Sequence, residues 1–234
     1  MKVLFTPTNK RMDQSVFPIL AYEENLSRFV DNGTGFLINE DGYFISAGHV
    51  FKNETRNYFA FVNSENYPIE IIYREYLEGS DQVVPIYLDL VIGRIRDVKI
   101  EEDKCLSFST DIKVKDELTL FGYSPRDLIS SGSAILPVEN YGESLPKFKS
   151  LSVICDRLSI WRKRDTGIIW FTNCLTIFMH NILAFGMSGG PIVDSGNNVF
   201  GMLITRDSCL SSMYIISILE KNNIKYKYIN KPCT

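Results

Sequence analysis

The chain has 234 residues and a mass of 26.8 kDa, and 45% of its residues are hydrophobic while 23% are charged. This composition is typical of a globular protein with a sizeable core, and it excludes intrinsic disorder, collagen-like repeats and coiled coils. The formal net charge of −3 argues against nucleic acid as the main partner, and no apolar run reaches the ~18 residues that a membrane span needs.

Short runs rich in Val, Ile, Phe and Tyr recur along the whole chain, bounded by Gly, Asn, Asp or Pro. Even spacing of this kind is typical of an all-β sandwich or barrel. The predicted strands are 35–39, 43–46, 58–62, 69–73, 88–94, 117–123, 151–155, 167–172, 190–193 and 199–205.

The sequence also predicts turns between these strands and one helix after them. The polar segment 39–42 predicts a tight hairpin that ends in a glycine able to adopt positive φ, and 195–198 predicts a second turn. A short turn is expected at 47–51. Helical periodicity is confined to 212–222, which predicts a short C-terminal helix.

The most polar connection between strand clusters is 97–116, so we expect two halves, 1–108 and 109–234. Two basic segments stand apart from the acidic average. The segment 161–164 is interpreted as a solvated loop, and the Lys/Tyr alternation at 225–228 as an exposed strand or tail. As nucleic-acid sites, both would need a clearly basic surrounding face.

The five cysteines are widely spaced and form no CxxC pair. This usage indicates reduced, inert packing thiols, and with only two histidines we expect no metal site and no cofactor. Residues 1–7 lack the apolar core of a secretory signal, which predicts a cytoplasmic protein.

The strongest chemical signal is GMSGGPIV at 186–193, in which Ser188 lies between glycines just before a β-type run. Glycines let the backbone bend sharply and bring N–H groups close to a reacting carbonyl. A serine hydroxyl needs a base to become a nucleophile, and His49 in 44–50 is the candidate. His180 has no such motif and is interpreted as a surface or pocket-wall histidine.

An imidazole base needs a carboxylate that holds its tautomer. Asp89 lies in an otherwise apolar run at 88–92, where an unpaired charge would be costly. Its rival, Asp81, stands in a polar loop where a carboxylate simply faces water.

These segments resemble the chymotrypsin-like (trypsin-like) serine peptidases, in their bacterial, non-secreted form. The likeness rests on 33–38 before the histidine, 44–50 around it, 88–92 around the aspartate and 186–191 around the serine. The order His, Asp, Ser distinguishes this family from subtilisins and α/β-hydrolases.

The resemblance implies an all-β fold of two packed six-stranded β-barrels with a short C-terminal helix. The first barrel (1–108) would carry His49 and Asp89, and the second (109–234) would carry Ser188. It assigns His49 as general base, Asp89 as its orienting partner and Ser188 as nucleophile, with the backbone N–H groups of Gly186 and Ser188 as the oxyanion hole.

Two positions depart from the family pattern. Met187 stands where secreted members have an aspartate that pairs with a newly cut amino terminus, so activation by that cleavage is excluded. Gly48 stands where alanine is more usual, a change that is mild in size.

By the same resemblance, the substrate-binding pocket is lined by Ile182 and, opposite it, by Ile204, Thr205 and Arg206. Ile182 in place of an acidic residue argues against a preference for Arg or Lys. A medium-sized apolar P1 residue is our hypothesis, while Arg206 leaves an acidic P1 residue open.

The sequence therefore predicts a serine endopeptidase that acts on a protein or peptide substrate, with a dedicated protein substrate or regulatory partner. The alternative is a protease-like fold kept as an idle or conditionally activated binding module. A nucleic-acid binder that uses 161–164 is the third interpretation, which the net charge disfavours.

Overall fold

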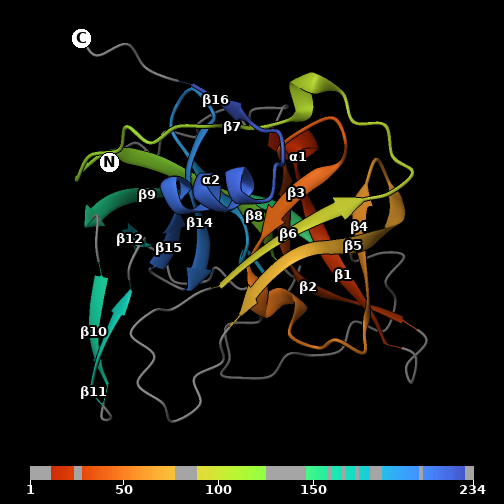
Figure 1. Ribbon diagram of the computed structural model, residues 1–234, viewed down its shortest axis with the longest axis horizontal. Coiled ribbons are helices and arrows are strands. Elements are labelled where there is room, and N and C mark those ends of the chain that lie inside the picture. The colour runs from red at the N-terminus through yellow and green to blue at the C-terminus, as the bar shows by residue number, and fades with distance from the viewer. Residues whose placement is uncertain are drawn as a thin grey trace.

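The computed structural model describes residues 12–23, 28–76, 89–124, 146–157, 160–164, 167–171, 174–179, 186–205 and 208–229. These residues form a mainly β protein with two β units, one built from the first half of the chain and one largely from the second (Figure 1). The all-β prediction is confirmed at this level.

The first unit is a closed six-stranded barrel, in the order β1-β2-β3-β6-β5-β4. Its strands alternate buried and more exposed residues where one face meets solvent, as in β4. In β6 every residue but Arg94 is buried. The strands are β1 (Val16–Glu23), β2 (Arg28–Leu37), β3 (Tyr43–Ser46), β4 (Asn57–Val62), β5 (Glu65–Tyr76) and β6 (Asp89–Ile95).

The second unit is an eight-stranded sheet in the order β13-β8-β9-β12-β15-β14-β7-β16, in which β13 also pairs with β14. A second closed six-stranded barrel is therefore not confirmed. The strands are β7 (Ser107–Phe108), β8 (Glu117–Ser124), β9 (Lys147–Arg157), β12 (Cys174–Met179), β13 (Pro191–Val193), β14 (Asn198–Thr205), β15 (Ser208–Ser211) and β16 (Lys227–Tyr228).

A separate hairpin of β10 (Ile160–Arg164) and β11 (Gly167–Phe171) lies below the second sheet in Figure 1. The interpretation of 161–164 as a loop is wrong, because the backbone of this segment pairs with β11. Strand pairing uses backbone groups alone, so a run of basic residues does not prevent it.

Short helices complete the fold: α1 (Met12–Ser15), the 3₁₀ turns η2 (Gly48–Phe51) and η3 (Glu102–Lys104), and α2 (Ser212–Lys221). The predicted C-terminal helix is confirmed as α2, which is capped by the Ser211 hydroxyl and buries Ile215, Ile218 and Leu219. The predicted hairpin turn is confirmed too, since Gly42 has φ +80° and the Asn39 side chain accepts hydrogen bonds from two backbone N–H groups in the turn.

One apolar cluster runs from the barrel into the second unit. It joins barrel residues such as Phe36 and Phe44 to Val199 and Met202 of β14 and to the buried face of α2. β7 pairs with β14 and β16, so the strand that ends at the predicted boundary belongs to the second sheet. The boundary at 108 itself stays a prediction.

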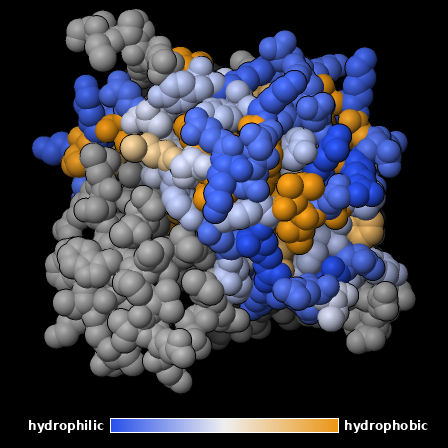
Figure 2. Space-filling view, viewed as in Figure 1, coloured by the Kyte–Doolittle hydropathy of each residue, from blue (hydrophilic) through white to orange (hydrophobic). Residues whose placement is uncertain are grey.

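The surface in view is mainly hydrophilic, with hydrophobic residues scattered between hydrophilic ones (Figure 2). Within the described residues, no helix has the length and apolarity to cross a bilayer.

Candidate active site

The predicted base lies in a tight turn at the end of a buried strand. β3 ends at Ser46, Ala47 is extended, and η2 begins at Gly48, so His49 leaves the barrel wall within one helical turn. Val50 and Phe51 of the same turn are buried in the barrel, which anchors the turn while the His49 ring stays partly exposed.

The His49 ring and the Asp89 carboxylate are in direct contact. Asp89 Oδ2 lies 2.7 Å from His49 Nδ1, and Asp89 Oδ1 accepts a 2.7 Å hydrogen bond from the His49 backbone N–H. The His49 side chain is 29% exposed and that of Asp89 is fully buried. An ionised carboxylate only accepts hydrogen bonds, so it selects the tautomer with the proton on Nδ1 and leaves Nε2 able to take a proton.

Gly48 is required by the path of β5. Asp89 opens β6 and pairs with Tyr76, the last residue of β5. A Cβ at Gly48 would lie 2.5 Å from the Glu75 carbonyl oxygen and 3.1 Å from Asp89 Oδ1. The change from alanine is therefore not mild in this chain, because strand β5 occupies the space that a methyl group would need.

The predicted nucleophile lies in a glycine turn before β13. Gly186 and Gly189 have φ of +80° and +86°, a region that favours glycine. The Gly190 N–H donates to the Met187 carbonyl at 2.8 Å, which closes the turn around Ser188. Met187 itself is fully buried in the apolar core of the second sheet, as suits a thioether where an aspartate would need a partner.

The Ser188 turn packs against the barrel close to His49. The Ser188 carbonyl accepts a 2.9 Å hydrogen bond from the Thr34 N–H on β2. A Cβ at Gly189 would lie 3.0 Å from the nitrogen of Ala47, two residues before His49. The structure, which describes both Ser188 and His49, has no hydrogen bond between their side chains. In unliganded enzymes the distance between a nucleophile and its base is often too long for one.

Two backbone N–H groups of the turn are candidate oxyanion donors. In the part of the chain that the structure describes, neither the Gly186 N–H nor the Ser188 N–H has an acceptor. Unpaired N–H groups on a glycine turn are the kind of donor that stabilises a developing oxyanion.

The predicted substrate-binding residues divide into two pairs. Ile204 and Thr205 end β14; Ile204 is buried in the apolar core and Thr205 is half-buried. Ile182 and Arg206 lie outside the described residues, as do Asp81 and His180. Ile204 thus behaves as a core residue, and the pocket stays a prediction.

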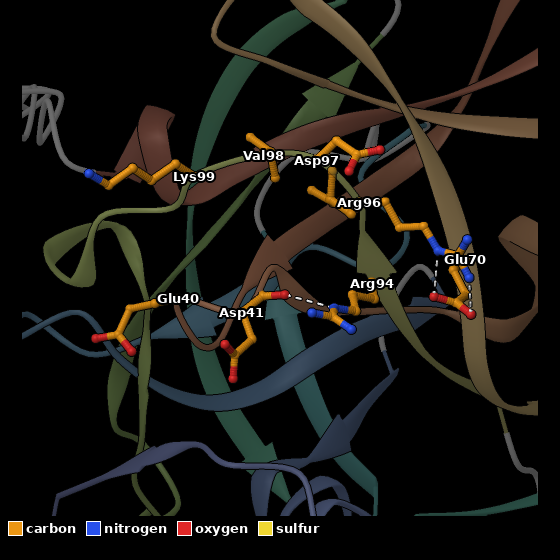
Figure 3. A pocket seen from close by; sticks show the side chains of 9 residues that line it. Glu40, Asp41, Glu70, Arg94, Arg96, Asp97, Val98 and Lys99 are labelled. Atoms are coloured by element: carbon orange, nitrogen blue, oxygen red, sulfur yellow. Dashed lines mark hydrogen bonds and ion pairs between the residues drawn. The ribbon is translucent and has the colours of Figure 1, made fainter.

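A cavity of about 720 Å³ lies at the other end of the barrel (Figure 3). Three of its charged side chains make hydrogen bonds within the protein: Arg96 makes two to Glu70, and Arg94 Nε donates to the Asp41 carbonyl. Asp41 precedes β3 whereas His49 follows it, so this cavity is not the predicted substrate site.

Among the described residues, no group of three or more His, Cys, Asp or Glu side chains could hold a metal ion. The basic segment at 225–228 makes contacts within the protein. Lys227 bonds the carbonyl and carboxylate of Glu102, and the Tyr226 hydroxyl donates to Glu220.

Sequence reasoning missed the role of Thr34 in this site. Thr34 is fully buried on β2, its hydroxyl donates to the Gly186 carbonyl at 2.8 Å, and that hydroxyl accepts from the Tyr123 N–H at 2.9 Å. The only sequence signal is a threonine between two glycines, which does not reveal a partner 152 residues away.

Comparisons with known proteins bear on this arrangement. A model of the trypsin-like peptidase domain matches residues 33–202, which span Thr34, His49, Asp89 and Ser188. No curated protein sequence matches the chain.

Several solved structures are similar to the chain in fold. The active form of the Rv3671c protease from M. tuberculosis has TM-score 0.61 and 16% identity, over 92% of this chain and 84% of that one. Deg5 has TM-score 0.58 and 16% identity, over 88% of each chain. The apo protease domain of MamO from Magnetospirillum magneticum has TM-score 0.58 and 12% identity, over 90% and 98%. These likenesses support the predicted chymotrypsin-like fold.

Proposed function

Because the chain belongs to the trypsin-like peptidase family, we propose that it is a serine endopeptidase that hydrolyses peptide bonds through an acyl-enzyme on Ser188. The observation that carries the proposal is the buried Asp89 carboxylate, which contacts His49 Nδ1 at 2.7 Å while the Ser188 turn packs on the same barrel.

The proposed acylation follows from these positions. His49 Nε2 accepts the hydroxyl proton of Ser188 as Oγ bonds to the scissile carbonyl carbon. The resulting oxyanion accepts hydrogen bonds from the Gly186 and Ser188 N–H groups, a type of donor worth about 10²–10³ in rate. His49 then gives its proton to the amide nitrogen, the C–N bond breaks, and the amine leaves.

Deacylation repeats these steps with water. His49 takes a proton from the water as its oxygen attacks the ester carbon, and the proton returns to Ser188 Oγ as the carboxylic acid product leaves. Asp89 stays ionised throughout and stabilises the imidazolium that forms in each half-reaction.

A fluorophosphonate probe tests this proposal, because it phosphonylates a serine only where a base and an oxyanion hole activate it. We expect wild type to be labelled, and Ser188→Ala and His49→Ala to be unlabelled, with kcat on a peptide substrate lower by about 10⁶-fold. Ser195→Ala, in an exposed turn beyond β13, is the matched control and should be labelled like wild type. Absence of labelling in folded wild type would support the idle module.

We also propose a medium-sized apolar P1 preference, set by Ile182 in place of an acidic residue, while Arg206 leaves an acidic P1 residue open. A peptide library scanned at P1 measures this preference. Cleavage confined to Arg and Lys would contradict it, and cleavage after Asp or Glu would assign the selectivity to Arg206.

The pairing of β13 with both β8 and β14 supports a finer proposal for the fold. Strands β8, β9, β12, β15, β14 and β13 then form a ring of pairings, and we assign this ring to the second predicted barrel. An experimental structure that leaves β13 paired on one side only would contradict it.

A further inference from the structure

The two residues of the predicted oxyanion hole depend on the same neighbour. Among the described residues, Gly186 makes one hydrogen bond, in which its carbonyl accepts from Thr34 Oγ1 at 2.8 Å. Ser188 likewise makes one, in which its carbonyl accepts from the Thr34 N–H at 2.9 Å. A single residue of the first barrel thus holds both ends of the turn that carries the nucleophile.

The Thr34 backbone is available for this contact because of where the β-ladder stops. β3 pairs with β2 at Phe36 and Leu37 and no further. At Thr34 the same edge of β2 is open, so its N–H donates to Ser188 and its carbonyl accepts from the Ser46 hydroxyl at 2.7 Å. Thr34 is fully buried, so water cannot replace these partners.

The direction of the Thr34 hydroxyl is also determined. Its oxygen accepts from the Tyr123 N–H of β8 at 2.9 Å, so its one proton is directed to the other neighbour, the Gly186 carbonyl. Gly186 has no side chain and a broad choice of backbone torsions, and its φ is +80°. Without the hydroxyl, no hydrogen bond in the described part of the chain would hold this residue.

We infer that Thr34 is a positioning residue for the reaction: its hydroxyl holds the Gly186 carbonyl, and through the Gly186 Cα it positions the Gly186 N–H relative to Ser188. This inference rests on the proposed serine peptidase function. The hydroxyl touches neither the substrate nor the reacting atoms, and acts through Gly186. Displacement of catalytic groups by about 1 Å is enough to reduce the rate by about 10²-fold.

Three variants test the inference. Thr34→Val keeps the shape of the side chain but lacks the hydroxyl, Thr34→Ser keeps the hydroxyl, and Thr119→Val makes the same change on β8, where the threonine is half-buried. We expect Thr34→Val to lower kcat and the rate of fluorophosphonate labelling by about 10²-fold with KM within about twofold. Thr34→Ser and Thr119→Val should stay within about threefold of wild type in all three quantities.

Hydrogen exchange of the Gly189 and Gly190 amides gives a readout that does not need activity, since both are hydrogen-bonded in the turn. We expect them to exchange at least about tenfold faster in Thr34→Val than in Thr34→Ser, while other barrel amides are unchanged. Labelling of Thr34→Val at the wild-type rate, or equal loss in Thr34→Ser, would overturn the inference. If wild type is not labelled, the peptidase proposal fails, and equal exchange in the two Thr34 variants would refute the role of the hydroxyl separately.

Discussion

In the first barrel, His49 and Asp89 are held by contacts made inside the barrel, whereas in the second sheet Gly186 and Ser188 take their hydrogen bonds from the other half. The proposed base and its carboxylate partner come from β3–η2 and β6, which are neighbours in one closed barrel. The nucleophile turn instead rests on Thr34 of β2. The proposed His49–Asp89 pair can thus form within one half alone, whereas the complete proposed site requires both halves to be docked.

After removal of Ser188 or His49 themselves, the largest effect on kcat is expected inside the barrel, at Asp89. Asp89→Asn keeps the size of the side chain but supplies an amide N–H to His49 Nδ1, which selects the wrong tautomer and should lower kcat by about 10⁴-fold. Steady-state kinetics measure this loss. Asp97→Asn, just after β6 at the remote end, is the control and should retain wild-type activity. A loss below tenfold in Asp89→Asn would mean that the pair does not act as base and orienting group.

Gly189 tests the contact between the halves. Its φ is +86°, and a Cβ there would lie 2.2 Å from the Thr34 carbonyl oxygen and 2.4 Å from Ser46 Oγ. Gly189→Ala should therefore lower the free energy of unfolding by about 2 to 5 kcal/mol. Thermal denaturation measures it against Gly196→Ala, where the nearest atoms are ends of side chains. Equal stability of the two variants would show that the halves are not packed tightly at this turn.

Gly48→Ala is the counterpart of Gly189→Ala and tests packing inside the barrel. A methyl group would meet the Glu75 carbonyl at 2.5 Å, so Gly48→Ala must displace β5 or η2, at a cost of about 1–3 kcal/mol. Because η2 carries His49, kcat should fall while KM changes little. Denaturant melts and steady-state kinetics measure the two effects. A variant as active and as stable as wild type would contradict the close approach of β5.

A smaller effect is expected for a hydrogen bond that joins the halves away from the serine. The Tyr214 hydroxyl of α2 donates to the Glu75 carboxylate of β5 at 2.5 Å, in a partly buried position. Tyr214→Phe should cost about 1 kcal/mol in unfolding free energy. Tyr226→Phe removes a similar but exposed bond to Glu220 within the second half and should cost less. If Tyr226→Phe lowered the melting temperature more than Tyr214→Phe, the hydrogen bond between the halves would contribute nothing to the free energy of unfolding.

The smallest effect is expected for alkylation of the buried cysteines in the native protein. Burial raises the pKa of the Cys105 thiol to about 11, and burial also raises the pKa of the Cys155 thiol. At pH 8 only about one Cys105 in a thousand is then a thiolate, and this fraction grows tenfold with each pH unit. Alkylation by iodoacetamide, followed by mass spectrometry, should be slow in the native protein and fast in urea. Rapid native alkylation of Cys105 would contradict its burial.

Local signals in the sequence predicted much of the barrel and of the site. Apolar runs bounded by turn residues predicted β3 and β4, and Gly42 predicted the hairpin. The serine and histidine motifs identified two turns that lie close together, since a Cβ at Gly189 would lie 3.0 Å from the Ala47 nitrogen. β1 was missed because Pro18 interrupts its apolar run, although the strand pairs with β2 on both sides of a register shift between Ile19 and Leu20. β10 was missed because side-chain polarity does not report backbone pairing.

Contacts between distant segments could not be predicted. Thr34 and Gly186 are 152 residues apart, and Glu75 and Tyr214 are 139 apart. Such pairs depend on how the halves dock, and docking is set by the shape of apolar surfaces. The same reason explains Gly48: only the path of β5 reveals that the position has no room for a methyl group.

The apolar cluster that runs from Phe44 through Val199 to Ile215 has a consequence for the protein in pieces. If the chain were cleaved in the connection between the halves, each fragment would expose a broad apolar surface and would collapse or aggregate alone. Mixed together, the two fragments should recombine into an active, non-covalent complex. The apolar contacts between the halves stabilise the fold, and the connecting peptide is not needed for them.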